Sequence, residues 1–527
     1  MTNVLTSPQP ARSKSNVVAL VAKNSLANLF RVGSSWIITL FLPPLLIRVM
    51  DKPTYAVWLL LLQLAAYITI FDGGIQMAIA RYVARHQSLG ARAQMARMLS
   101  SVGFVLILSS LFTILIVAVT SWYLTGIFRS IPSAVSASAR SALFVVGVSL
   151  ALNLPFSVLA GFFLGRQQNE IGALAASVGK FAGALGSGWA AYHHQGLLVM
   201  AIWVAAGNLI QSIVYSIFWK REPSQGLLRP SLVEQPVARE FIVFCSAMMV
   251  SQFSFLLVTG MDMPVVAAFD FRFAAYYGVA SILSNLLAVP HGAIVSSLLP
   301  IASEISASED PDRMGQALLK TTVFGTAVLC LITLPLFLLM PLFLKVWVGA
   351  DYARHAMLLG QILVVAQFIR LTMFPYALIG FAGGQQNRML LSPLAEGITN
   401  LACSIALAQV IGARGVAIGT LIGAIVGVGL HFTVSMKKTD CVRLRRSKLL
   451  AQGIMRPIAF MLPFLLLVLL YTRLHSPALE VLLMAVAELT MCFLFWKFVF
   501  DEGERVAVLN LLARFQRFGK NTVVLDA

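Results

Sequence analysis

The sequence predicts an all-α polytopic membrane protein with about fourteen transmembrane helices, arranged as two parallel six-helix lobes plus two C-terminal helices. Two observations predict this class. Apolar runs of about 20 residues, the length that a helix needs to cross a bilayer, recur along the whole chain. Short motifs of the first half also recur in the second half at a nearly constant offset. The first observation indicates the class, and the second indicates the arrangement.

The composition excludes a soluble protein. Of the 527 residues, 59% are hydrophobic and 11% are charged, and the mean hydropathy is +0.85. A soluble domain carries about 25% charged residues. The net charge of +18 could suggest nucleic acid, but Lys and Arg gathered in loops on one side of a membrane explain it better, so no nucleic acid is expected. The five cysteines are scattered, which predicts neither a disulfide framework nor a metal site.

The predicted spans follow one another with short connections. The first six cover residues 26–47, 55–80, 99–127, 139–164, 171–192 and 197–219. Six more cover 241–269, 274–299, 318–348, 357–382, 390–411 and 416–436, and the last two cover 457–474 and 478–500. With a cytoplasmic N-terminus, roughly three quarters of the loop Lys and Arg lie on the cytoplasmic side, as the positive-inside rule requires. Both termini are therefore predicted to be cytoplasmic, and residues 1–16 lack the apolar core of a cleavable signal peptide.

An internal repeat organises these spans. Asp51 and Asp270, at the outer ends of the first and seventh spans, are 219 residues apart, and Asp72-Gly73 has the same offset from His291-Gly292. Six spans per copy is an even number, so both copies must have the same orientation and be related by an axis along the membrane normal. The predicted parts are a cytoplasmic N-terminal tail (1–24), an N-lobe (25–220), a cytoplasmic connector (221–238), a C-lobe (239–438), a basic cytoplasmic loop (439–456), two extra helices (457–500) and a cytoplasmic tail (501–527).

Cations inside the spans mark a candidate substrate site, because a charge at bilayer depth costs about 2.5–3.5 kcal/mol on insertion scales. Arg31, Lys180 and Arg370 lie within predicted spans. A cavity that contains them would attract an anion such as a phosphate, which Arg can fork and Lys can contact as a compact charge. The alternative is that each cation pairs with a buried acid or reaches a lipid headgroup. Asn153, one of several amides within spans, is a further candidate for substrate binding, although such amides also join neighbouring helices.

Acids inside the spans are candidates for coupling or gating. Asp72 in the second span and Glu396 in the eleventh could take up a proton or a cation, or neutralise a cation in one state, and the sequence leaves these roles open. Asp262 in the seventh span and His291 in the eighth join them as candidates. No catalytic constellation and no metal-spaced set of His and Cys is evident. The outer loops are short, which disfavours a membrane polymerase, and no enzymatic activity is expected.

One predicted span has a face without side chains. Gly415, Gly419, Gly423 and Gly427 are four residues apart in the twelfth span, so they share one side of the helix. Small residues at this spacing allow two membrane helices to approach closely. We therefore expect this face to pack tightly against another helix.

Several short motifs are spread over roughly residues 23–438. They are residues 55–58, Asp72-Gly73-Gly74, Arg81-Tyr82-Val83-Ala84, Gly165-Arg166-Gln167-Gln168-Asn169, Asp262 and Trp347-Val348-Gly349. Together they resemble the motifs of bacterial polysaccharide flippases of the Wzx type, which belong with MurJ-like lipid II flippases and MATE exporters in the MOP superfamily. Ala56 stands where that family usually has Gly.

The resemblance implies a multi-pass flippase in the bacterial inner membrane. Its cargo would be an undecaprenyl-diphosphate-linked oligosaccharide for O-antigen, capsule or exopolysaccharide assembly, moved to the periplasmic leaflet by alternating access. The diphosphate would sit among Arg31, Lys180 and Arg370. Membrane lipids, H+ or Na+ and other polysaccharide assembly proteins are the further expected partners, and no cofactor is expected. A cation-coupled multidrug exporter of the same fold and a membrane polysaccharide polymerase or ligase are the alternatives.

Overall fold

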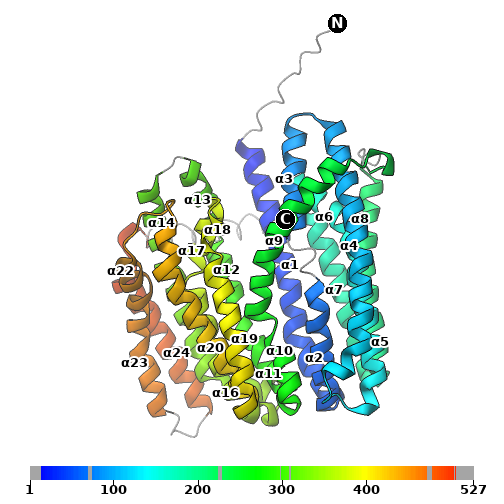
Figure 1. Cartoon of the computed structure of the whole chain (residues 1–527). Coiled ribbons are helices and arrows are strands. Elements are labelled where there is room, and N and C mark those ends of the chain that lie inside the picture. The colour runs from blue at the N-terminus through cyan, green and yellow to red at the C-terminus, as the bar shows by residue number, and fades with distance from the viewer. Residues whose placement is uncertain are drawn as a thin grey trace, which may run out of the picture. The chain divides into compact units, whose positions relative to one another are not determined.

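The chain is helical, and it divides into two compact units that we describe separately, Met1–Phe253 and Ser254–Ala527 (Figure 1). The computed structural model describes residues 14–68, 74–222, 228–296, 298–307, 310–471, 477–503 and 505, and no strand occurs among them. Asp72 and most of both predicted tails lie outside the described residues. The boundary between the units falls within α9 (Gln235–Thr259), so the predicted lobe limits at 220 and 239 stay predictions.

The first unit contains nearly all of its residues in helices. Figure 1 shows α4, α5, α7 and α8 running side by side, with α3 and α6 packed together near one end. The helices are α1 (Lys14–Val49), α2 (Lys52–Ala66), α3 (Ile75–Ser88), α4 (Arg92–Ile127), α5 (Ser133–Asn153), a 3-10 turn η2 (Leu154–Phe156), α6 (Ser157–Gly165), α7 (Asn169–Tyr192), α8 (Gly196–Lys220), a 3-10 turn η4 (Pro230–Leu232) and the first part of α9.

Glycine fixes two features of this unit. Gly74 precedes α3 with a φ of 81°, which a residue with a side chain rarely adopts. On α7, a Cβ added at Gly179 would lie 2.5 Å from the carbonyl oxygen of Gly207 on α8. The backbones of α7 and α8 therefore touch, as small residues in membrane helices allow. At the other packed pair, Ile79 of α3 and Phe162 of α6 are fully buried in one apolar core.

The second unit repeats the packing of the first. α19 packs on α20 as α7 packs on α8, α16 packs on α20 as α5 packs on α8, and α13 packs on α17 as α3 packs on α6. The repeat in the sequence is thus matched by a repeat in the fold. The elements are α10 (Asp262–Phe269), α11 (Phe271–Asn285), α12 (Ala288–Val295), α13 (Leu298–Ala307), α14 (Pro311–Leu338), α15 (Met340–Trp347), α16 (Ala350–Leu371), α17 (Phe374–Ala382), α18 (Gln386–Met389), α19 (Leu391–Ile411), α20 (Ala413–Leu430), α21 (Met436–Lys438), α22 (Arg446–Lys448), α23 (Arg456–Tyr471) and α24 (Pro477–Leu494), with π-helical turns at His431–Ser435, Leu449–Met455 and Phe495–Val499.

The described residues do not confirm the predicted count of fourteen spans. Among the described residues, eleven helices are long and apolar enough to cross a membrane, or twelve if the bent pair Gln252–Thr259 and Asp262–Phe269, with an angle of 42°, is one span. The predicted second span is not one of them, because the structure has two separate helices there, α2 and α3. The predicted fifth span is the 24-residue α7, whose many Gly and Ser residues and Lys180 make it less apolar. The membrane class is confirmed, and the count of fourteen is not.

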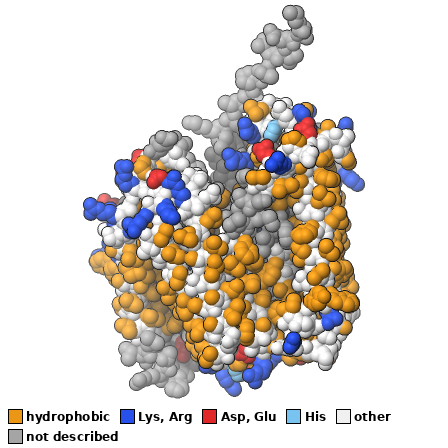
Figure 2. Space-filling view, viewed as in Figure 1, with side chains coloured by type: hydrophobic (Ala, Val, Ile, Leu, Met, Phe, Trp, Pro, Cys, Tyr) orange, Lys and Arg blue, Asp and Glu red, His pale blue; other side chains and the backbone are white. Residues whose placement is uncertain are grey.

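Polar contacts join the predicted cytoplasmic segments at one end of each unit. In the first unit, Arg97 pairs with Glu234 at 3.0 Å and Arg166 pairs with Glu222. In the second unit, the loop predicted to be cytoplasmic carries two ion pairs, Arg388–Asp440 and Arg443–Asp312. Figure 2 shows hydrophobic side chains over the bodies of the helices and Lys and Arg near their ends. This distribution is the one that a bilayer requires of a multi-pass protein.

Candidate functional site

A cavity of about 280 Å³ lies inside the first unit, between α1, α2, α7 and α8. Its polar lining comes from Ser35 and Thr39 of α1, Lys180 and Ser187 of α7 and Asn208 of α8. Trp58 of α2 and several aliphatic side chains form the rest of the wall. Lys180 is the only charged residue among the described residues that line this cavity. The cavity is therefore positively charged and rich in hydrogen-bond donors.

The structure brings two of the three predicted cations together. The Lys180 Nζ donates to the Ser35 Oγ at 2.9 Å, and this hydroxyl donates in turn to the carbonyl oxygen of Arg31 at 3.1 Å. Arg31 stands one helical turn before Ser35 on α1, and its charge acts on Lys180. Both cationic side chains are exposed within the first unit. An anion that contacts Lys180 is thus also within the field of Arg31.

Asn153 has a different environment from Lys180. It is the last residue of α5, and its Oδ1 accepts a hydrogen bond from the Ser212 Oγ of α8. One turn earlier on both helices, the Asn208 Nδ2 donates to the Ser149 Oγ at 2.9 Å. These two contacts tie α5 to α8. Asn208 lines the cavity, and Asn153 is not one of its lining residues.

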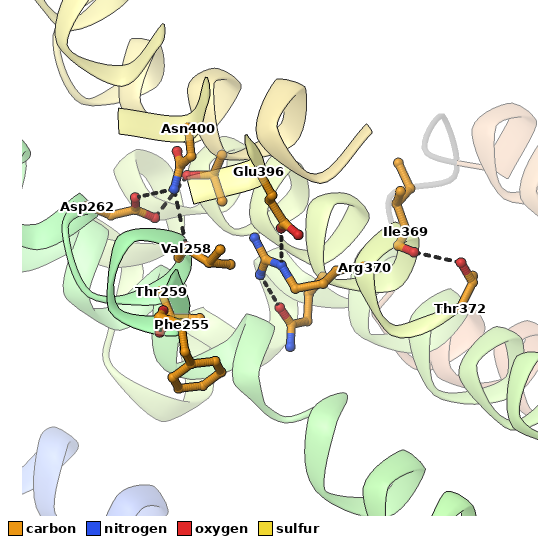
Figure 3. A network of polar contacts seen from close by, with 11 residues as sticks. Phe255, Val258, Thr259, Asp262, Ile369, Arg370, Thr372, Glu396 and Asn400 are labelled. Atoms are coloured by element: carbon orange, nitrogen blue, oxygen red, sulfur yellow. Dashed lines mark hydrogen bonds and ion pairs between the residues drawn. The ribbon is translucent and has the colours of Figure 1, made fainter. Parts of the chain in front are cut away.

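The third predicted cation, Arg370 of α16, forms an ion pair in the second unit. Its Nε donates to the Glu396 Oε1 of α19 at 2.6 Å, and its Nη1 donates to the Gln367 Oε1 at 2.7 Å (Figure 3). Glu396 is 8% exposed and Arg370 is 19% exposed, so water screens this pair poorly. The Nη2 of Arg370 is buried and has no hydrogen-bond partner in the structure. Of the two interpretations that the sequence left open, pairing with a buried acid is the one observed here.

A second polar network lies beside this pair, around Asp262 of α10. Asp262 accepts hydrogen bonds from the Asn400 Nδ2 at 3.1 Å, from the Tyr277 hydroxyl at 2.9 Å and from the Thr420 Oγ1 at 2.9 Å. The charge of Arg370 also acts on Asp262. Figure 3 shows Asp262 and Asn400 close to the Arg370–Glu396 pair. The acids that reasoning from the sequence treated separately thus belong to one region of the second unit.

The glycine face predicted for the twelfth span holds this region together. α20 packs against α19, and a Cβ added at Gly427 would lie 2.5 Å from the Glu396 Oε2. A Cβ added at Gly423 would lie 2.8 Å from that of Asn400. The bare face of α20 therefore leaves room for the two polar side chains, and the predicted close packing is confirmed.

His291 of α12 lies in another part of the second unit. It is fully buried, and neither ring nitrogen has a hydrogen-bond partner in the structure. Its ring centroid is 6.0 Å from that of Phe374, and a Cβ added at Gly325 of α14 would lie 3.0 Å from its Nε2. A metal role finds no support here, because the described residues contain no group of three or more His, Cys, Asp or Glu that could hold a metal ion. The coupling role of His291 stays a prediction.

The structure adds residues that the sequence did not single out. Ser35, Tyr277 and Thr420 each bind a predicted charged residue. Hydroxyl side chains are common in membrane helices, so nothing in the sequence distinguishes these three from the others. Asn208 and Gln367 were visible as amides within spans, but their partners depend on how the helices pack.

No protein-family model and no curated protein sequence matches this chain. Solved structures do match it. A structure of the lipid II flippase MurJ in an inward closed conformation has a TM-score of 0.69 at 15% identity, and the match covers 90% of this chain and 99% of that one. An inward-facing MATE family multidrug resistance transporter of the MOP superfamily has a TM-score of 0.63 at 13% identity, with 76% and 97% covered. A point mutant of the Vibrio cholerae MATE transporter VcmN has a TM-score of 0.58 at 14% identity, with 81% and 98% covered.

These matches identify the fold as that of MOP superfamily transporters. Identities of 13–15% carry the fold and no more. The expected likeness to this superfamily is confirmed at that level, and the narrower likeness to Wzx-type flippases is not confirmed. The alternative of a polymerase or ligase receives no support from these neighbours, which are transporters and flippases.

Proposed function

We propose that this protein is a transporter that moves an undecaprenyl-diphosphate-linked oligosaccharide from the cytoplasmic to the periplasmic leaflet, for O-antigen, capsule or exopolysaccharide assembly. The cationic cavity of the first unit is the observation that carries the proposal. A diphosphate loses its hydration when it enters a membrane, and fixed cations replace that hydration with charge-assisted hydrogen bonds. Lys180 in the cavity, with Arg31 one turn from Ser35, offers such an environment.

The volume of the cavity indicates which part of the cargo it would hold. Small-molecule pockets usually measure about 300–1,000 Å³, and this cavity of about 280 Å³ holds a headgroup-sized anion only. Lys180 would contact one phosphate, and Arg31 would fork the other. Ser35 and Asn208 would add neutral hydrogen bonds. The prenyl tail would stay in the bilayer, and the sugars would occupy the transport path.

The network around Asp262 is our candidate for the binding site of the coupling ion. The Asp262 carboxylate accepts hydrogen bonds from the Thr420 hydroxyl and the Asn400 amide nitrogen, and the Asn400 Oδ1 accepts one from the Ser404 hydroxyl, so carboxylate, hydroxyl and amide oxygens belong to one network. Oxygen ligands of this kind suit a hard cation such as Na+, and the carboxylate can alternatively take a proton. Arg370 and Glu396 would respond to the charge that Asp262 gains or loses. Asp72 and His291 remain candidates for coupling from the sequence.

A cation-coupled multidrug exporter is the second candidate function. The acidic network around Asp262 and the MATE structures among the neighbours favour it. The cation in the cavity of the first unit disfavours it, because a cationic drug would be repelled by Lys180.

Reconstituted protein tests the proposal. Proteoliposomes would carry a prenyl-diphosphate-linked saccharide, and an external glycosidase would measure its appearance on the far leaflet. We expect the wild-type protein to accelerate this step and Lys180→Met to abolish the acceleration. Lys345→Met, at an exposed lysine of α15, is the matched control and should behave as the wild type. Export of a cationic dye without any acceleration of lipid movement would instead support the second candidate.

A further inference from the structure

A second cavity, of about 600 Å³, lies in the first unit and shares no lining residue with the Lys180 cavity. It opens between α4, the turn η2 with α6, the end of α8 and the segment 228–233. Its wall is mostly apolar, and its large side chains are Phe104 and Ile107 of α4, Phe156, Leu159 and Trp219. We call this cavity the α4–α8 groove. Its volume is within the usual range for a small-molecule site.

The groove lies at the predicted cytoplasmic boundary of the membrane. α4 has 36 residues and is about 54 Å long at 1.5 Å per residue, so it extends well beyond a hydrocarbon core of about 30 Å. The lining of α4 begins at Ser100, and Lys220 is the last residue of α8. Phe104 and Ile107 are 47% and 49% exposed and stand on one side of α4. The apolar wall is thus at the depth of the inner-leaflet acyl chains.

The rim of the groove is cationic. Lys220 and Arg229 line it, and its described lining contains no acid. Two acids of the surrounding segments pair with other cations, Glu222 with Arg166 and Glu234 with Arg97. The backbone N–H of Arg229 donates to the Ser100 Oγ at 3.0 Å, which anchors this segment against α4. The two cations therefore stand above an apolar wall, an arrangement that complements an anionic headgroup with its acyl chain.

We propose that the α4–α8 groove binds an anionic phospholipid of the cytoplasmic leaflet. One acyl chain lies against Phe104 and Ile107, and the phosphate lies between Lys220 and Arg229. An anionic leaflet attracts a juxtamembrane Lys or Arg, and the apolar wall adds a site for the acyl chain that a free phosphate would not use. The bound lipid joins α4, α8 and the segment 228–233, so anionic lipid stabilises this end of the first unit.

Photocrosslinking of the full-length protein tests the lipid site. Proteoliposomes of phosphatidylcholine would contain a small fraction of phosphatidylglycerol with a diazirine in one acyl chain, or phosphatidylcholine with the same chain. We expect phosphatidylglycerol to label peptides that contain Phe104, Ile107 or Leu159 several-fold more than phosphatidylcholine does. Equal labelling by the two lipids would overturn the proposal.

Variants with matched controls sharpen this test. The double variant Lys220→Gln and Arg229→Gln should lose the preference for phosphatidylglycerol, whereas Arg221→Gln, at a neighbouring residue outside the lining, should keep it. Gly103→Leu should block the groove. An added Cβ at Gly103 meets only side chains at 3.8 and 3.9 Å, so the backbone tolerates it, and the rest of the Leu side chain would occupy the groove. Gly126→Leu on the same helix, where a Cβ meets no atom within 4 Å, is its control.

Competition separates a bilayer lipid from the transported lipid. Unlabelled phosphatidylglycerol should reduce the labelling. Addition of an equal amount of undecaprenyl diphosphate should cause no further reduction. A groove that undecaprenyl diphosphate empties and phosphatidylglycerol does not would belong to the transport path, and the proposal would be wrong. The proposal is independent of the cargo, since a multidrug exporter could carry the same lipid site.

Discussion

The two units carry matching helix pairs with different charges. α7 packs on α8 in the first unit and α19 packs on α20 in the second, in the same way. Lys180 stands on α7 and faces a hydroxyl and an amide, whereas Glu396 and Asn400 stand on α19 and face Arg370 and Asp262. The first unit thus holds a site with an unbalanced cation, and the second holds a balanced ion pair with a further acid, Asp262, beside it. The two units share their helix packing and differ in their charged side chains, so the side chains and not the packing decide what each unit can bind.

The largest expected difference between the two sites concerns stability. Arg370→Ala leaves Glu396 buried without its partner, and breaking a buried pair in this way costs about 3–5 kcal/mol. Lys180→Ala removes a cation that no acid balances within its cavity, so its cost should be small. Thermal unfolding of the purified proteins in detergent measures both changes. Equal midpoints for the two variants would show that the Arg370–Glu396 pair is not structural.

A rescue experiment sharpens the same contrast. Replacing both partners, Arg370→Met with Glu396→Leu, should recover most of the lost stability, because no uncompensated charge remains in the protein. Arg370→Lys should recover part of it, since the charge is kept and the forked contact with Gln367 and Glu396 is lost. A double variant as unstable as Arg370→Ala alone would contradict the ion-pair account.

The next effect concerns coupling. Asp262→Asn removes the charge on which Asn400, Tyr277 and Thr420 converge. We expect transport to continue at the rate observed without an ion gradient and to lose its response to pH and Na+. Asp270→Asn is the control, because Asp270 accepts a hydrogen bond from the backbone N–H of Ala413 at 3.1 Å and plays a local structural part. An unchanged response to both ions in Asp262→Asn would move the coupling role to another acid.

A smaller effect is expected within the cationic cavity. Ser35→Ala removes the hydroxyl that holds Lys180, and one hydrogen bond to a charged group is worth about 1.5–3 kcal/mol. Titration of a fluorescent prenyl diphosphate should show weaker binding than in the wild type and stronger binding than in Lys180→Met. Ser34→Ala is the control, because the hydroxyl of this neighbouring serine donates to the carbonyl oxygen of Phe30 on its own helix, and it should bind as the wild type does. A Ser35→Ala protein with wild-type affinity would show that Lys180 needs no positioning.

The smallest effect separates the two amides of α5 and α8. Asn153→Ala removes a contact between helices, so it should lower stability by about 1 kcal/mol and leave ligand binding unchanged. Asn208→Ala should reduce binding, because Asn208 lines the cavity. Thermal unfolding and the same titration measure the two outcomes. Weakened binding in Asn153→Ala alone would restore Asn153 as a substrate ligand.

The sequence predicted those features that a period or an offset records directly. The apolar runs indicated the membrane class, and the offset of 219 residues between Asp51 and Asp270 predicted a repeat that the packing of the two units matches. The four-residue spacing from Gly415 to Gly427 predicted the face of α20 that packs on α19. In each case the local pattern is itself the cause of the packing.

Features that depend on helix contacts were not predictable in the same way. Arg370 and Glu396 are 26 residues apart on different helices, so the sequence left open whether they meet. The predicted second span contains Gly74, whose left-handed backbone precedes a new helix, α3, and hydropathy alone does not register such a break. Tyr277 and Thr420 bind Asp262 from two further helices, and only the fold brings them together.

The most direct test of the central claim is a comparison of ligand affinities in the purified protein. The affinity for a prenyl diphosphate is measured against that for the uncharged prenyl alcohol of equal length, in the wild type, in Lys180→Met and in the control Lys345→Met. The account predicts a strong preference for the diphosphate in the wild type and in the control, and its collapse in Lys180→Met. A Lys180→Met protein that keeps the full preference for the diphosphate would contradict the account.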